Sequence, residues 1–350
     1  MRHRVQGPLV PAVILTPCLG VTTMQTKLKP PAAGIAGTTL SQRERFRSEQ
    51  RRLCRRILVR YDLYLMLLIP VAWYLIFQYG PMYGVQIAFK NFQPAKGIVG
   101  SPWVGVDNFE RFFSSYYFGR LLWNTISISL YSLLFSFPIP ILLALLINEI
   151  RSQSFKKWLQ NVTYIPHFIS VVVIVGMLQL FLGAQTGFIN VLLHAAGAEK
   201  IAFLNSGEWF KTVFIGSNIW QNMGWQSIIY IAALSGINPQ LYEAAKMDGA
   251  SRFHRIWHVS IPGILPIIII LLILDVGHFM NIGFEKILLM QNNLNKDASD
   301  VIQTFIYTNG ILKGDFGYTS AIGLFNSVIN FALLILINRF ARKKAETSLW

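Results

Sequence analysis

Residues 264–284 read ILPIIIILLILDVGHFMNIGF, a run in which Asp275 is the one charged residue. A helix needs about 20 mostly apolar residues to cross a hydrocarbon core of about 30 Å, because each residue advances it by about 1.5 Å. This stretch therefore predicts a membrane-spanning helix. It makes an all-α membrane protein the expected fold class, since a membrane-spanning helix satisfies its own backbone hydrogen bonds.

Five further stretches have the same character, and with 264–284 they predict six transmembrane helices within residues 61–345. They are Leu63–Tyr79, Leu121–Ile147, Tyr164–Leu182, Val213–Leu234 and Tyr318–Ile337. The composition agrees, because 53% of the 350 residues are hydrophobic and only 13% are charged. That balance excludes an ordinary soluble domain.

The basic residues predict the orientation in the membrane. If the N-terminus is cytoplasmic, 22 of the 31 Lys and Arg residues fall in segments on the cytoplasmic side, which is the side that retains them. Both termini are then expected in the cytoplasm. The net charge of +15 does not indicate a nucleic-acid partner, because these residues cluster beside apolar runs.

Residues 1–60 precede the first predicted span and are rich in arginine. We expect a disordered, basic cytoplasmic extension whose arginine-rich part lies at the lipid surface. A signal peptide is disfavoured because Pro11 and Pro17 interrupt the apolar stretch and no small-residue cleavage pattern follows. A chain start at Met24 stays open as an alternative.

The connection between the fourth and fifth spans, NPQLYEAAKMDGASRFHRIWHVSIP over 238–262, predicts a helix–turn–helix elbow. Asn238 suits a helix N-cap and Pro239 the first helical position. Gly249 suits a left-handed turn, and Ser251 can cap a second short helix that Pro262 ends near Ser260. Ala244 and Ala245 give a small-residue face that another protein can approach closely.

This elbow resembles the EAA loop of binding-protein-dependent ABC importer permeases. The usual form of that loop is E-A-A, three residues, G, nine residues, and then I-x-L-P. Glu243, Ala244, Ala245 and Gly249 occupy those positions, and Val259-Ser260-Ile261-Pro262 closes the motif with Val and Ile as departures. The resemblance implies a type I importer permease fold with a cytoplasmic coupling elbow.

Other stretches resemble the carbohydrate-uptake branch of that family, particularly oligosaccharide, polysaccharide and maltose-type permeases. They are Gly100–Gly105 with Asn108-Phe109, Asn124-Thr125, Tyr164–Ser170 and Asn281–Glu285. The likeness then covers roughly residues 60–345. It implies ATP-driven import of a carbohydrate across the cytoplasmic membrane of a bacterium.

The resemblance also implies an assembly of several subunits. The expected partners are a second homologous permease, two cytoplasmic ATPases that bind ATP and Mg, and an extracytoplasmic solute-binding protein. This chain would hold no cofactor or metal and would catalyse no reaction. Its expected coupling residues toward the ATPase are Glu243, Ala244, Ala245, Asp248, Gly249 and Pro262.

Competing functions find less support in the sequence. The chain has no phosphate-binding G-x-x-x-x-G-K-[ST] loop and no H-E-x-x-H or G-x-S-x-G motif, so neither an ATPase nor a membrane hydrolase is indicated. A secondary transporter would be expected to carry several intramembrane charges or inverted repeats. Import of a non-sugar solute remains an alternative, and neither the sugar nor its chain length follows from the sequence.

Polar residues within the last three spans predict the substrate path, since such groups are costly against lipid. Helix spacing places Gln221 and Trp225 on one face, and Asp275, His278 and Asn281 along one stripe. The predicted path residues are Gln221, Asn222, Trp225, Asp275, His278, Asn281, Asn326 and Asn330. The alternative is that these groups anchor the helices at interfaces or to one another.

Overall fold

The structure, a computed structural model, describes residues 61–345, with side chains through Lys343. The predicted extension over residues 1–60 lies outside the described residues. By contact density the chain divides into two units, residues 1–71 and residues 72–350. The site lies in the second unit.

The regular secondary structure of the described residues is helical, apart from an isolated bridge between Lys90 and Trp103. The first long helix, α2 (Tyr61–Tyr74), runs on through π-helical, α (α3, Gly80–Met82) and 3₁₀ turns to Phe89. The helices that follow are α4 (Gly97–Gly100), α5 (Asp107–Phe113), α6 (Phe118–Ser136), α7 (Pro138–Asn148), α8 (Gln153–Tyr164), α9 (Val171–Leu182), α10 (Phe188–Ala195), α11 (Gly207–Ser235), α12 (Pro239–Met247), α13 (Arg252–Arg255), α14 (Ile261–Gly277), α15 (Phe284–Met290), α16 (Lys296–Ser299), α17 (Ile302–Ile306) and α18 (Phe316–Ala345).

Four helices in the described part are long and apolar enough to cross a membrane. They are Tyr61–Phe89, Phe118–Asn148, Arg252–Gly277 and Phe316–Lys343, and one bent pair makes a fifth at most. The predicted fourth span, Val213–Leu234, lies in α11, which is 29 residues long. It is not among the four because Asn218, Gln221, Asn222 and Gln226 lower its hydropathy.

The predicted third span, Tyr164–Leu182, is not one straight helix. The helical segment Gln153–Phe168 meets α9 at a bend of 100°. Pro166 interrupts the ladder because it has no N–H, and the Ser170 side chain caps a new helix by accepting from the Val173 N–H. The predicted span therefore contains a sharp bend beside Pro166, and with Gln153–Phe168 it counts as one broken span at most.

The predicted fifth span has both ends displaced. Pro262 does not end a short helix, because the helical run continues from Arg252 through a π-helical turn to Gly277. At the other end the helix stops at Gly277 instead of Phe284. Residues 278–283 unwind, and Asn330 on α18 accepts a hydrogen bond from the Met280 N–H at 2.9 Å.

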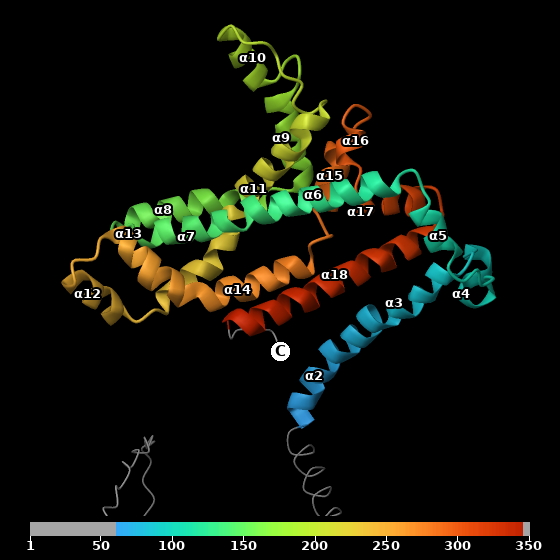
Figure 1. The fold of residues 1–350 in the computed structure, drawn as a ribbon, viewed down its shortest axis with the longest axis horizontal. Coiled ribbons are helices and arrows are strands. Elements are labelled where there is room, and N and C mark those ends of the chain that lie inside the picture. Colours follow the sequence, from blue (N-terminus) through green and yellow to red (C-terminus); the bar gives the residue numbers. More distant parts are fainter. Residues whose placement is uncertain (1–60, 346–350) are drawn as a thin grey trace, which may run out of the picture. The chain divides into compact units, whose positions relative to one another are not determined.

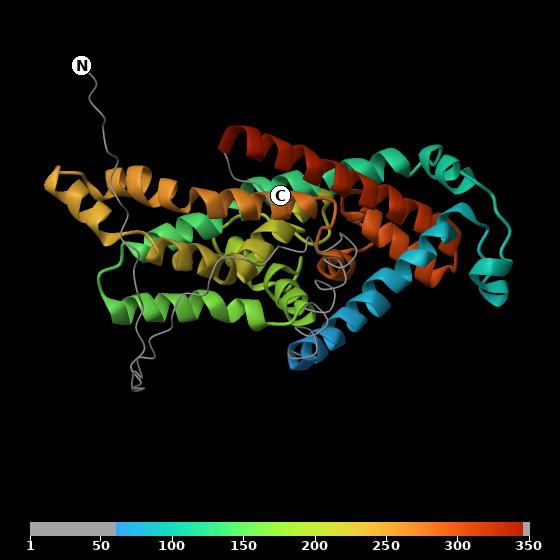
Figure 2. The same cartoon turned by 90° about the horizontal axis from the view of Figure 1, so that it is seen from below.

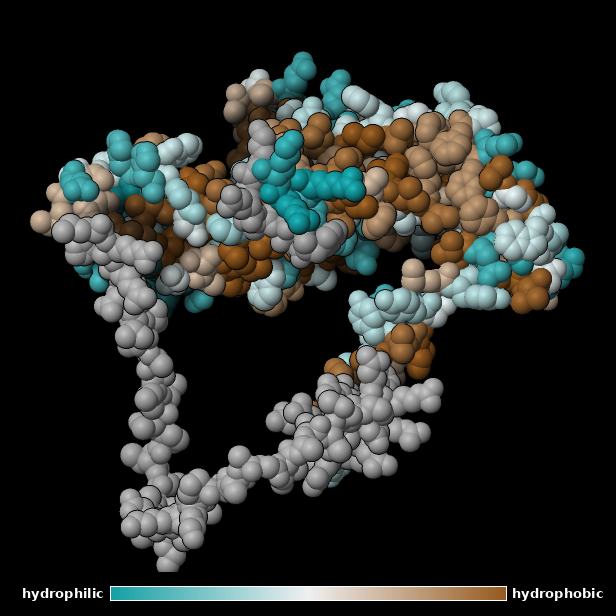
Figure 3. Space-filling model, turned by 60° about the horizontal axis from the view of Figure 1, so that its bottom comes forward, coloured by the Kyte–Doolittle hydropathy of each residue, from teal (hydrophilic) through white to brown (hydrophobic). Residues whose placement is uncertain are grey.

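The second unit packs its long helices side by side, as Figures 1 and 2 show. α11 contacts α6, α7 and α8, and α14 packs along α18. Phe210 and Phe214 of α11 form one buried cluster with Ile287 and Met290 of α15, which fixes that short helix. Figure 3 shows hydrophobic side chains over much of one face, with hydrophilic ones mainly toward its ends and in one patch between them.

Candidate functional site

The elbow over residues 238–262 forms as its sequence predicts at its first turn. The Asn238 side chain accepts from the Gln240 N–H at 3.0 Å, and Pro239 occupies the start of α12. At the other end Gly249 has φ +77°. Its N–H donates to Lys246 O at 3.1 Å, and the next N–H, of Ala250, donates to Ala245 O at 2.9 Å. This hydrogen-bond pair is a Schellman cap, which requires a left-handed residue at the glycine position.

The outer surface of the elbow is open to a partner. Glu243, Ala244 and Asp248 are exposed and Ala245 is half-buried. Met247 exposes 88% of its surface. Such a combination of small, acidic and apolar exposed groups suits close docking by another protein.

The inner surface of the elbow is fixed to the helices. Tyr242 Oη lies 3.0 Å from Ser260 Oγ, a hydroxyl on the helical run that leads into α14. Arg255 pairs with Glu149 at the end of α7 at 3.7 Å, and both side chains are mostly buried. The elbow is therefore attached to both α7 and α14.

A polar cavity lies among α6, α11, α14 and the unwound residues 278–283. It consists of two adjoining parts of about 220 and 440 Å³. The two parts adjoin because they share five lining residues: Phe214, Asn218, Asn281, Ile282 and Gly283. We call this space the central cavity.

One wall of the central cavity is a row of serines on α6. Ser129, Ser132 and Ser136 line it at spacings of three and four residues, which places them on one helix face. Their hydroxyl oxygens have no hydrogen-bond partner among the described residues. Buried hydroxyls are normally satisfied, so this row can receive hydrogen bonds from a polar solute or water.

Gln221 and Asn222, two of the residues predicted for the substrate path, line the central cavity. Asn222 Nδ2 donates to Asn218 Oδ1 at 2.9 Å, and Gln221 Nε2 donates to Ile169 O at 3.2 Å. These bonds hold both amides at the wall. Asn218 lies between the two parts of the cavity.

Asp275, His278 and Asn281 also line the cavity, but they do not form a helical stripe. Asp275 is in the last turn of α14 and is exposed in the single chain, and the other two lie beyond the helix end. Among the described residues no ion pair joins Asp275 to His278. Instead, His278 Nδ1 lies 3.0 Å from the carbonyl oxygen of Leu274.

The remaining three predicted path residues lie outside the central cavity. Trp225 shares the face of Gln221 as predicted, but it stacks on His167 with ring centroids 4.7 Å apart and packs at the 100° bend. Asn326 donates to Asn281 Oδ1 at 3.0 Å, and Asn330 accepts from Met280 N–H. Both asparagines are buried and hold residues 278–283 in their unwound form.

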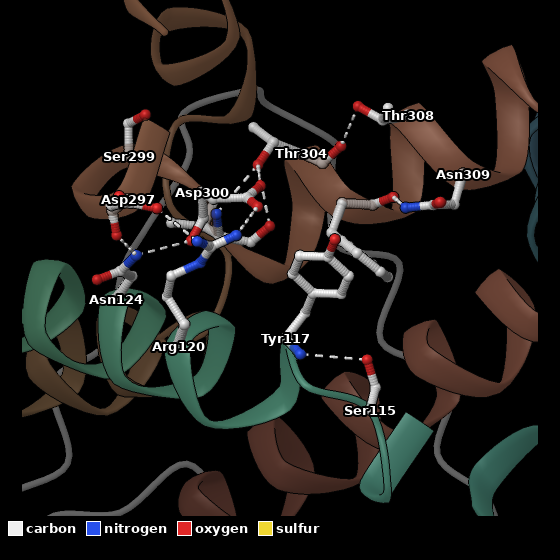
Figure 4. Close-up of polar contacts among 12 residues, drawn as sticks. Ser115, Tyr117, Arg120, Asn124, Asp297, Ser299, Asp300, Thr304, Thr308 and Asn309 are labelled. Carbon is white, nitrogen blue, oxygen red and sulfur yellow. Dashed lines mark hydrogen bonds and ion pairs between the residues drawn. The ribbon is translucent and has the colours of Figure 1, made fainter. Parts of the chain in front are cut away.

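A separate polar cluster joins α6 to α16 and α17, as Figure 4 shows. Arg120 pairs with Asp297 and Asp300, and Asn124 donates to the carbonyl oxygens of the same two residues at 2.7 and 3.0 Å. A cavity of about 580 Å³ opens beside it, and no predicted path residue lines that cavity. Burial raises the pKa of Asp300, and the positive charges of Lys296 and Arg120 partly offset this rise.

Sequence reasoning missed several cavity residues. The serine row could have been found from its spacing within the predicted span Leu121–Ile147. Gln303 and Lys286 had no such signal, because they lie in connecting segments whose path depends on tertiary contacts.

Comparison with known proteins gives a consistent set of relatives. Residues 136–346 match the family model described as "Binding-protein-dependent transport system inner membrane component". The Bacillus subtilis (strain 168) polygalacturonan/rhamnogalacturonan transport system permease protein YteP is 43% identical, over 87% of this chain and 95% of the relative.

Two solved structures of a bacterial alginate ABC transporter also resemble the chain. One, of a transporter involved in import of the acidic polysaccharide alginate, has a TM-score of 0.79 and 41% identity over 84% of this chain and 99% of that chain. The other, in complex with an alginate pentasaccharide-bound periplasmic protein, has a TM-score of 0.79 and 40% identity, covering 85% of this chain and all of that chain.

Proposed function

Because this chain belongs to the binding-protein-dependent transport system inner membrane components, we propose that it carries an oligosaccharide or polysaccharide fragment through its central cavity. The family predicted from the EAA elbow is confirmed, and the chain is a multi-pass inner-membrane permease, not itself an enzyme. In such transporters the ATPase is a separate subunit.

The observation that carries the proposal is the chemistry of the central cavity. Its walls present the Ser129, Ser132 and Ser136 hydroxyls together with the amides of Asn218 and Gln226. Sugar hydroxyls both donate and accept hydrogen bonds, and hydroxyl and amide groups satisfy both roles. Such a lining inside helices that are otherwise apolar suits the passage of a polar solute rich in hydroxyl groups.

The proposal includes six membrane crossings, with both termini in the cytoplasm. The four apolar helices, the bent pair and α11 together supply six. The polar residues that lower the hydropathy of α11 face the central cavity, so they need not contact lipid. The permease domain would then be 61–345, preceded by a cytoplasmic extension.

The elbow is proposed to dock into the ATPase. Ala244 and Ala245 permit close approach, while Glu243 and Asp248 offer polar contacts. Gly249 sets the reversal of the chain, and Pro262 starts α14 after its π-helical turn. ATP and Mg bound by two ATPase subunits would thereby drive α7 through the Arg255–Glu149 pair and α14 through the Tyr242–Ser260 contact.

The remaining partners are a second homologous permease and an extracytoplasmic solute-binding protein that delivers the sugar. The exposed path residues Asp275, His278 and Asn281 would face the passage between the two permeases.

Reconstitution of the whole importer in proteoliposomes tests this function. We expect uptake of a labelled oligosaccharide only with ATP, the ATPase subunits and the loaded binding protein. Uptake that continues without the ATPase, or that follows an ion gradient, would show a different class of transporter.

A further inference from the structure

Lys286, near the start of α15, is a buried cation in the wall of the central cavity. It exposes 3% of its surface. Its neighbours Ile287 and Met290 are buried in the cluster that includes Phe214, so α15 holds the lysine in place. The packing of α15 therefore fixes the backbone of Lys286 at the cavity wall.

No acidic side chain neutralises Lys286 among the described residues. Its one hydrogen-bond acceptor there is Gln221 Oε1, at 3.5 Å. An ammonium group has three N–H donors, and lysine is rarely buried without a partner. Burial lowers the pKa of Lys286 to about 8, so at neutral pH it is still largely protonated.

Two other cations in the described part of the chain have close partners. Lys90 donates to Ile98 O at 2.6 Å, and Arg111 pairs with Asp315 at 2.8 Å. Glu285 also lines the cavity but is exposed and makes no ion pair with Lys286. Lys286 differs from these two cations because it is buried with only one long hydrogen bond and lines the central cavity.

The neighbouring groups suit a sugar ring that carries an acid. Asn218, Asn222 and Gln221 line the same part of the cavity as Lys286, and Gln303 Oε1 there has no hydrogen-bond partner among the described residues. Amides bind hydroxyls, whereas an unpaired ammonium binds a carboxylate more strongly than a neutral group.

We propose that Lys286 binds a carboxylate of the transported glycan, so that the substrate of this importer is an oligosaccharide of sugar acids. This inference rests on the proposed carbohydrate function and narrows its substrate class. The lysine acts as a specificity residue of the permease, separate from any selection by the binding protein.

The test uses the assembled permease and ATPase complex in nanodiscs without the binding protein, so that only permease groups are measured. The probes are trigalacturonate, an alginate trisaccharide, the methyl esters of both, and maltotriose. Binding is measured by saturation-transfer NMR for the wild type, Lys286→Gln and Lys286→Arg. Asn222→Ala is the matched control, since it removes an amide from the same wall.

We expect at least one acid to bind wild type about tenfold or more tightly than its ester. Lys286→Gln should abolish that difference, Lys286→Arg should keep it, and Asn222→Ala should weaken acid and ester alike. Equal binding of acid and ester, binding of maltotriose alone, or no binding of any probe would overturn the inference. So would equal loss of acid and ester binding in Lys286→Gln, which would indicate a structural lysine.

Proteoliposome uptake separates this inference from the proposed function. ATP-dependent uptake of neutral oligosaccharides with no preference for acids would contradict only the role of Lys286. Absence of ATP-dependent uptake for every sugar would contradict the carbohydrate function itself.

Discussion

Gly249 allows a sharp test of the coupling elbow, because its substitution acts through the backbone alone. The residue has φ +77°, and an added Cβ would meet no atom within 4 Å. Alanine in this left-handed conformation costs roughly 1–2 kcal/mol, whereas asparagine adopts it more readily. Proline fixes φ near −65° and removes the N–H that donates to Lys246 O, so it costs about 3 kcal/mol or more.

These energies predict a graded loss of coupling. A cost of 1–2 kcal/mol changes the ratio of the formed to the deformed elbow by about 5- to 30-fold. Sugar uptake per ATP hydrolysed should therefore fall in the order Gly249→Asn, Gly249→Ala, Gly249→Pro. The amount of permease in the membrane should stay near the wild-type level, because no packed side chain is disturbed.

A matched control is available at Gly314, before α18. It has φ +76° and no atom within 4 Å of an added Cβ, but it lies far from the elbow in the chain. Gly314→Ala carries the same backbone strain and should leave coupling unchanged. If Gly249→Pro transported with normal coupling, or if both alanine variants lost coupling equally, the assignment of the elbow to ATPase coupling would be refuted.

Three further perturbations test the fold and the topology. Gly224→Ala should prevent stable accumulation, because its Cβ would clash with the Thr163 carbonyl oxygen. Gly216→Ala on the same helix has open space around its Cβ, so the variant should accumulate normally by immunoblot. Asn330→Ala leaves a buried backbone N–H without its acceptor, so thermal melting should show a loss of about 1–3 kcal/mol while sugar preference is unchanged. A cysteine placed at Asn205 should react with an impermeant thiol reagent only from outside the cell, and labelling only from inside would contradict the topology.

The elbow could be predicted from the sequence because its determinants are local. Asn238, Pro239 and Gly249 act within one turn of their own position, through caps and a left-handed glycine. The apolar helices were also predictable, since hydropathy alone indicates them.

The breaks in the helices could not be predicted in the same way. The end of α14 at Gly277 depends on Asn330. The side chain of Asn330 accepts a hydrogen bond from the backbone N–H of Met280, 50 residues earlier in the sequence. Residues that appear to form one stripe, such as Asp275 and Asn281, are then separated by the unwound segment. Lys286 was missed for a related reason, because only the packing of α15 shows that it is buried.

The central claim is that a sugar passes through the central cavity beside the α6 serine row. It can be tested by replacing Cys18 and Cys54 with serine and introducing a cysteine at Ser132, with Leu134→Cys as the control on the exposed side of α6. In the reconstituted importer a small hydrophilic thiol reagent should modify Ser132→Cys, and transported oligosaccharide with ATP should slow that reaction severalfold. Leu134→Cys should show no protection by sugar. A Ser132→Cys variant that transports normally but reacts at the same rate with and without sugar would contradict passage through this cavity.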